Sequence, residues 1–108
     1  MKILLDECVD RRLARDLPGH FVKTAPQMSW ASLKNGRLLG LAHLEFDIFL
    51  TVDSNLKFQQ NLSQFEIAVI VLATSSNRLT DLRAFVPEIL RAIPIAKKGE
   101  AIVISGPQ

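Results

Sequence analysis

The 108-residue chain has an ordinary globular composition, with 48% hydrophobic and 22% charged residues, which excludes a low-complexity or disordered polymer. Its length predicts a single domain, residues 1–108, that buries roughly two-thirds of the surface exposed by the unfolded chain. The apolar runs are far shorter than the roughly 20 residues that cross a bilayer, so we expect no membrane span. A formal net charge of +2 gives only a mild preference for anionic partners.

The amino terminus and the cysteine content favour the cytoplasm. Asp6 and Glu7 stand where a secretory signal would carry its apolar core. The single cysteine, Cys8, cannot form an intrachain disulfide and agrees with a reducing compartment. We therefore expect a cytoplasmic protein.

The first half of the chain reads as alternating strands and helices. Residues 2–5 form a mostly apolar run that predicts a buried strand, and apolar spacing over 9–17 predicts a helix that Pro18-Gly19 ends. Residues 20–24 predict a short strand, followed by a loop. A mainly buried helix is expected over 35–46, with Asn35 as its N-cap.

The second half continues the alternation. Residues 48–52 predict a strand, 54–65 a short helix capped by Ser54, and 67–73 the clearest strand of the chain. Residues 82–93 have the strongest helical period. Pro87 there predicts either a kink or two helices with the proline in the first turn of the second. A last strand, at a sheet edge, is expected over 101–104.

This order predicts a three-layer α/β/α domain around a central, mainly parallel sheet of about five strands. In such sheets, binding sites collect outside the carboxyl ends of the strands. Asp6, Glu7, Asp53 and the polar loop 74–77 all leave the sheet at that edge. Any chemistry is therefore expected there.

Carboxylates that converge at one edge repel each other unless a cation or strong donors offset the charge. We expect Asp6 and Asp53 to ligate Mg²⁺ or Mn²⁺, with Glu7 as a further ligand or as the group that orients a water. Such an ion polarises a phosphodiester and activates its bound water. In the alternative interpretation, Asp6 and Asp53 only cap the helices that follow them.

Cations cluster near the same strand ends. Arg11, Arg12 and Arg15 follow the first acids, and further cations near the other strand ends are Lys34, Arg37, Lys57, Arg78 and Arg83. Such an arrangement can follow a phosphate backbone. In the alternative, these side chains belong to solvated helix faces.

Several segments together resemble a known family. The segments MKILLDECVDRRLARDLPGH, WASLKNGRLLGLA, FLTVDSNLKFQQNL and SNRLTDL are similar to small bacterial PIN-like proteins, relatives of toxin nucleases of the VapC kind, over residues 1 to about 93. The resemblance implies a PIN-like α/β/α domain that cuts RNA with Mg²⁺ or Mn²⁺. It also implies a toxin-antitoxin setting, with a small antitoxin protein as partner. A homodimer is a separate candidate assembly.

Carried over by position, Asp6 matches the first acid of the family and Asp53 the acid after the central strand, with Glu7 beside the first. The expected catalytic residues are therefore Asp6, Glu7 and Asp53, and the expected metal ligands are Asp6 and Asp53. The residues expected to contact RNA are Arg11, Arg12, Arg37, Asn55 and Gln59. Similar proteins usually carry an acid at the position of Arg37, so a PIN-like domain that binds RNA or a protein without cleavage is an alternative.

Receiver domains of two-component signalling are a second alternative. They carry an acid pair after the first strand, a phosphoacceptor Asp after the third and a Thr or Ser after the fourth, which Asp6-Glu7, Asp53 and Thr74 satisfy. A lysine after the fifth strand is lacking, because Lys97 and Lys98 precede that strand.

Overall fold

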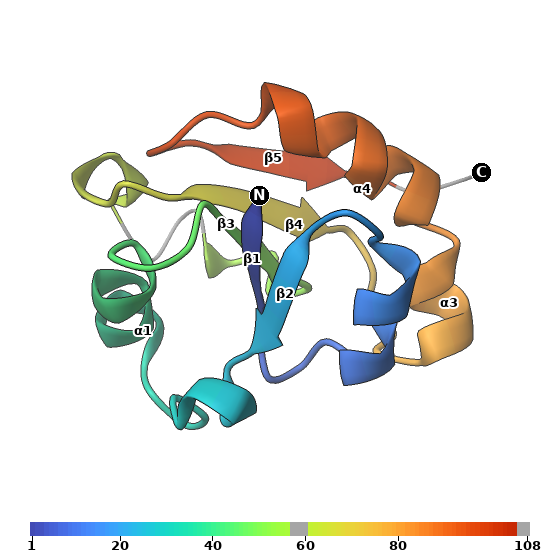
Figure 1. The fold of residues 1–108 in the computed structure, drawn as a ribbon, viewed down its shortest axis with the longest axis horizontal. Helices are drawn as coiled ribbons and strands as arrows, with labels where there is room; N and C mark the ends of the chain where they lie inside the picture. Colours follow the sequence, from blue (N-terminus) through green and yellow to red (C-terminus); the bar gives the residue numbers. More distant parts are fainter. Residues whose placement is uncertain (57–60, 106–108) are drawn as a thin grey trace.

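The computed structural model describes residues 1–56 and 61–105, and within them five strands form one parallel sheet (Figure 1). The strands are β1 (Lys2–Leu5), β2 (Phe21–Thr24), β3 (Ile48–Thr51), β4 (Ala68–Leu72) and β5 (Ala101–Ile104). Their spatial order is β2-β1-β3-β4-β5. All five lie where the apolar runs predict them, and β5 lies at an edge as expected.

The inner strands β3 and β4 are buried along their whole length, and β1 is buried from Ile3 onward. Strands that are covered on both faces need apolar residues at successive positions, which explains the unbroken runs in this part of the sequence. Parallel strands also need a crossover between them, and the segments between the strands provide it.

The helices are shorter than the apolar spacing predicts. They are α1 (Asn35–Ala42), α3 (Leu79–Arg83) and α4 (Val86–Ala92), with 3₁₀ turns η1 (Arg11–Asp16), η2 (Pro26–Met28), η3 (Leu62–Gln64) and η4 (Ile93–Ile95). Pro87 divides the last helical region and stands in the first turn of α4, as one of the two alternatives predicts. The helix expected over 54–65 falls partly on residues 57–60, outside the described part of the chain.

The predicted N-cap of α1 is wrong. Lys34 holds the N-cap position, and Asn35 is the first residue of the helix. The expected helix over 9–17 is a 3₁₀ turn instead, and the Asp10 carboxylate begins it by accepting a hydrogen bond from the N–H of Arg12 at 2.9 Å.

Two apolar cores lie on opposite faces of the sheet. One packs Leu13, Leu82 and Ile89 from η1, α3 and α4 against alternate residues of the strands. The other packs Leu38 and Leu39 from α1 against the remaining strand residues. In Figure 1, α1 accordingly lies on one side of the sheet, and η1, α3 and α4 lie on the other. The predicted three-layer α/β/α class is confirmed.

Within residues 1–56 and 61–105, no helix combines the length and the apolar character that a membrane span requires.

Candidate active site

The first and third strands bring the predicted acids to one edge of the sheet. β1 and β3 are neighbours in register, with Leu5 opposite Leu50, and the N–H of Asp6 continues the ladder by donating to the carbonyl of Leu50 at 2.9 Å. The chain leaves β1 toward β2 on one side and leaves β3 toward β4 on the other. In parallel α/β sheets, this point of divergence is the usual location of a ligand site.

The carboxylate of Asp6 is buried, with 8% of the residue exposed. Its Oδ1 accepts the N–H of Glu7 at 2.8 Å, and its Oδ2 accepts the hydroxyl of Thr51 at 2.7 Å. The thiol of Cys8 also donates to Oδ2, at 3.4 Å. These donors offset the cost of removing the carboxylate from water, and they fix its orientation at the end of β1.

Thr51 joins the two acids. Its hydroxyl donates to Asp6, and the same oxygen accepts the backbone N–H of Asp53 at 3.0 Å. The side chain is fully buried at the end of β3, so one hydroxyl without access to solvent fixes both acidic segments relative to each other. Sequence reasoning missed this residue. The available signal is that Thr51 is the one polar residue in the run from Ile48 to Val52.

Asp53 lies just beyond the sheet and is partly exposed. Its Oδ1 accepts the N–H of Asn55 at 3.0 Å, and its Oδ2 accepts the side-chain amide of Asn35 at 3.2 Å. Oδ1 thus closes a local turn after β3, and the helix that Asp53 would cap falls partly on residues 57–60, outside the described part of the chain. Each carboxylate oxygen has two lone-pair sites, so both oxygens of Asp53 retain capacity for a further ligand.

Glu7 is exposed and reaches the loop that follows β2. Its carboxylate oxygens lie 3.4 and 3.3 Å from the backbone nitrogen of Ser32, which donates to them. Ser32 has a φ of 69°, in the left-handed region that is uncommon for residues other than glycine. The loop therefore adopts a strained backbone at the point where it contacts the predicted site.

The donor set limits the kind of metal ion that fits. Among the residues described, no three side chains of the His, Cys, Asp and Glu types gather in a way that could hold a metal. Mg²⁺, however, often retains several waters and uses only one or two carboxylates. Asp53, which accepts two protein donors, fits such a largely hydrated ion better than Asp6, which accepts three and is more deeply buried.

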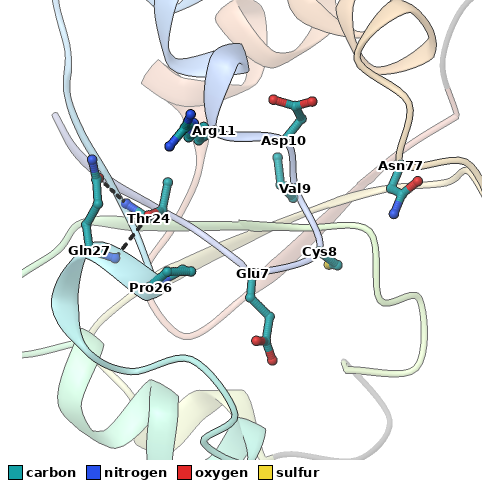
Figure 2. A pocket seen from close by; sticks show the side chains of 9 residues that line it. All are labelled: Glu7, Cys8, Val9, Asp10, Arg11, Thr24, Pro26, Gln27 and Asn77. Atoms are coloured by element: carbon teal, nitrogen blue, oxygen red, sulfur yellow. Dashed lines mark hydrogen bonds between the residues drawn. The ribbon is translucent and has the colours of Figure 1, made fainter.

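A surface cleft of about 570 Å³ opens beside Glu7 (Figure 2), and neither Asp6 nor Asp53 lines it. Thr24 and Gln27 form one side of it, linked by reciprocal backbone-to-side-chain bonds of 2.9 and 3.2 Å, and Asn77 lies on the opposite side. The remaining lining residues are Glu7, Cys8, Val9, Asp10, Arg11 and Pro26. The residues that line the cleft thus include two acids, a cation and two amides.

The thiol of Cys8 is not activated in this cleft. Burial raises its pKa above the ordinary value, and the negative charge of Asp6 acts in the same direction. The thiol is therefore protonated at neutral pH and serves as a donor to Asp6, which argues against a nucleophilic cysteine.

The residues expected to contact RNA do not all lie at the cleft. Arg11 lines the cleft, whereas Arg12 is engaged by Asp10 through bonds of 3.1 and 2.8 Å. Arg37 is exposed in α1, and Asn55 is exposed two residues after Asp53. Gln59 lies outside the described residues. Of the four that the structure describes, Arg11 is the one that lines the same cleft as Glu7.

Replacement of Arg12 tests how strongly this residue lowers the pKa of the Asp10 carboxyl. Arg12 lowers the pKa of the Asp10 carboxyl to about 2 through its side-chain hydrogen bond, so Arg12→Ala is expected to raise that pKa toward the ordinary 3.8. Because the folded-state pKa is depressed, this pair stabilises the domain above the unfolded value, and the stabilisation is lost as the pH falls toward 2.

An NMR titration of the Asp10 carboxyl carbon measures this shift. Arg15→Ala, in the same 3₁₀ turn, is the control and should leave the titration unchanged. An Asp10 pKa that stays near 2 in Arg12→Ala would mean that another group holds the carboxylate.

Comparison of the chain with protein-family models, with curated proteins and with solved structures found no match in any of the three.

Proposed function

We propose that this chain is a metal-dependent ribonuclease of the PIN-like kind, related to the toxin components of toxin-antitoxin systems. The observation that carries the proposal is the bridge by which the Thr51 hydroxyl joins the Asp6 carboxylate to the backbone N–H of Asp53. Two neighbouring strands deliver the two acids to the divergence point of the sheet. An unbroken apolar core gains little from such a polar arrangement, since a buried carboxylate must be compensated by donors.

Each of these side chains has its own role in the proposed reaction. Asp53 binds the ion, and Asp6 positions Thr51 and the start of the acidic loop. A bound Mg²⁺ or Mn²⁺ supplies polarisation of the phosphodiester and activation of water. Glu7, exposed beside the cleft, orients the attacking water, and Arg11 holds a phosphate of the RNA in the same cleft.

The test is cleavage of labelled single-stranded RNA in the presence of Mn²⁺, with and without a chelator. Asp53→Asn is expected to lower the cleavage rate by about 100-fold or more, since the isosteric amide has no negative charge for the ion. Asp47→Asn is the matched control, because Asp47 precedes the same strand at its opposite end and an amide oxygen can still accept the Lys2 N–H.

Cleavage that persists unchanged in Asp53→Asn would remove Asp53 from the mechanism. Cleavage that survives the chelator would remove the metal. Equal losses in Asp47→Asn and Asp53→Asn would indicate a general effect on folding.

A binding function without cleavage is the second candidate, and Arg37 favours it. Arg37 lies in α1 two residues after Asn35, whose amide contacts Asp53. A cation in this helix opposes the binding of another cation nearby. RNA retained by a wild-type protein that does not cleave it would support this candidate.

A receiver-type phosphoacceptor is the third candidate, and the strand order favours it. The order β2-β1-β3-β4-β5 is that of flavodoxin-like doubly wound folds, to which receiver domains belong. Asp53 follows the third strand, as a phosphoacceptor would. Against this candidate, Lys97 and Lys98 precede β5, whereas receiver domains carry their lysine after the fifth strand. Labelling of Asp53 by acetyl phosphate would support it over the nuclease.

A further inference from the structure

The two edges of the sheet differ in how they are protected. β2 forms one edge and carries Lys23 within the strand, and an edge lysine is a common device against unwanted strand pairing. β5 forms the other edge, and its four residues, Ala101 to Ile104, include no charge and no proline. An apolar edge of this kind is a template for pairing with another strand.

The backbone of β5 has unused hydrogen-bonding groups on its outer side. The carbonyls of Glu100 and Ile104 accept the N–H groups of Val69 in β4 and of Ala73 just after it, and Ile102 lies between them in the same register. Since alternate residues of a strand direct their backbone groups to opposite sides, the N–H and C=O groups of Ala101 and Val103 point outward. Within the described part of the chain, no strand lies beyond β5.

The surface beside this edge combines exposed apolar side chains with charges of both signs. A groove of about 400 Å³ runs between α4, η4 and β5, and α4 is drawn beside β5 in Figure 1. Ile95 and Val103, which line it, are 68% and 42% exposed. Glu88 and Arg91 also line the groove and form an ion pair with each other.

We propose that β5 pairs with β5 of a second copy of this chain, antiparallel and about a two-fold axis. A two-fold interface requires a surface that complements itself. The outward groups of Ala101 and Val103 meet this condition, because placing Ala101 of each copy opposite Val103 of the other forms four backbone hydrogen bonds. Glu88 and Arg91 meet it too, since they give the groove no net charge and can exchange partners between copies.

The absence of net charge in the groove favours a second copy of this chain as the partner. A strongly acidic or basic partner would find no complementary excess in this groove, whereas a second copy brings both signs in the required places. The pairing buries the exposed apolar side chains of Ile95 and Val103 and extends the sheet across both copies. The proposal concerns the edge opposite β2 and is independent of the ribonuclease proposal.

Sedimentation of the whole protein over a concentration series tests the proposal. The wild type is expected to form dimers as concentration rises, and Val103→Lys and Val103→Pro are expected to weaken association by about tenfold or more, a loss of roughly 1.4 kcal/mol. Proline is tolerated on an edge strand where its missing N–H faces outward, so both variants should keep the wild-type far-ultraviolet circular dichroism. Phe21→Ser, at the other edge, is the control and should dimerise normally.

Amide hydrogen exchange of the wild type gives a second measurement. It reports which N–H groups are protected by association and which are protected by folding alone. The N–H groups of Ala101 and Val103 should exchange rapidly at low concentration and slowly at high concentration, whereas that of Ile102, directed at β4, should exchange slowly at both. A wild type that stays monomeric throughout the series would overturn the proposal. Dissociation of the dimer by Phe21→Ser, with no effect of the Val103 variants, would overturn it as well.

Discussion

Thr51→Val is expected to destabilise the domain by about 2–3 kcal/mol and to slow RNA cleavage by roughly 10- to 100-fold. Valine has nearly the same shape as threonine, so the variant removes the hydroxyl without opening a cavity. The carboxylate of Asp6 then loses its 2.7 Å donor, and the N–H of Asp53 loses its acceptor. A buried charge without one of its donors accounts for most of the expected loss of stability.

Urea denaturation at neutral pH measures the loss of stability, and the RNA assay measures the loss of activity. Thr51→Ser is the matched control, because it keeps the hydroxyl and should retain most of both properties. A Thr51→Val protein that is destabilised but cleaves RNA at the wild-type rate would show that Thr51 stabilises the sheet without positioning Asp53.

Phe49→Ala is expected to lower the free energy of unfolding by about 3–5 kcal/mol. Phe49 is fully buried in β3, in the core that joins α1 to the sheet, and the smaller side chain leaves a cavity there. This loss is a large fraction of the roughly 5–15 kcal/mol that stabilises an ordinary domain.

Leu44→Ala is the control for Phe49→Ala, because Leu44 is apolar but 74% exposed, and its replacement should change stability by no more than about 0.5 kcal/mol. Thermal unfolding followed by circular dichroism separates the two variants. Similar transition temperatures for both would contradict the position of Phe49 in a packed core.

The sheet could be predicted from the sequence because its signals are local. Each inner strand is a continuous apolar run, and the runs at 2–5 and 48–52 end in acids. Right-handed crossovers and parallel pairing then place the carboxyl ends of these runs at one edge. The adjacency of β1 and β3 agrees with that expectation and brings Asp6 close to the end of β3.

The details of the site could not be predicted, because they depend on contacts between distant residues. Asn35 is of a residue type that is favoured at N-caps, yet its side-chain amide donates to Asp53, 18 positions away. Ser32 reaches Glu7 across 25 positions, through a backbone conformation that no local pattern requires. Thr51 looks like an ordinary β-branched strand residue, and its partner Asp6 is 45 positions earlier.

The lengths of the helices could not be predicted for a different reason. Apolar spacing over 9–17 is consistent with an α-helix, but the Asp10 carboxylate accepts the N–H of Arg12, which begins a tighter 3₁₀ turn at Arg11. Such local side-chain bonds compete with regular helix. Spacing reports which residues are buried and does not by itself report which helical geometry buries them.

The bond between Thr51 and Asp6 also bears on how the sheet finds its alignment. A strand with one solvent-exposed face is held in register by its alternating polarity, but β3 and β4 are buried on both faces. Sliding β3 along β1 would therefore still bury most of its apolar side chains. Only the native alignment gives the Asp6 carboxylate the Thr51 hydroxyl; a shifted one leaves a charge buried without that donor. The same polar pair therefore favours the native register of β1 and β3 over shifted registers that burial of apolar side chains alone would allow.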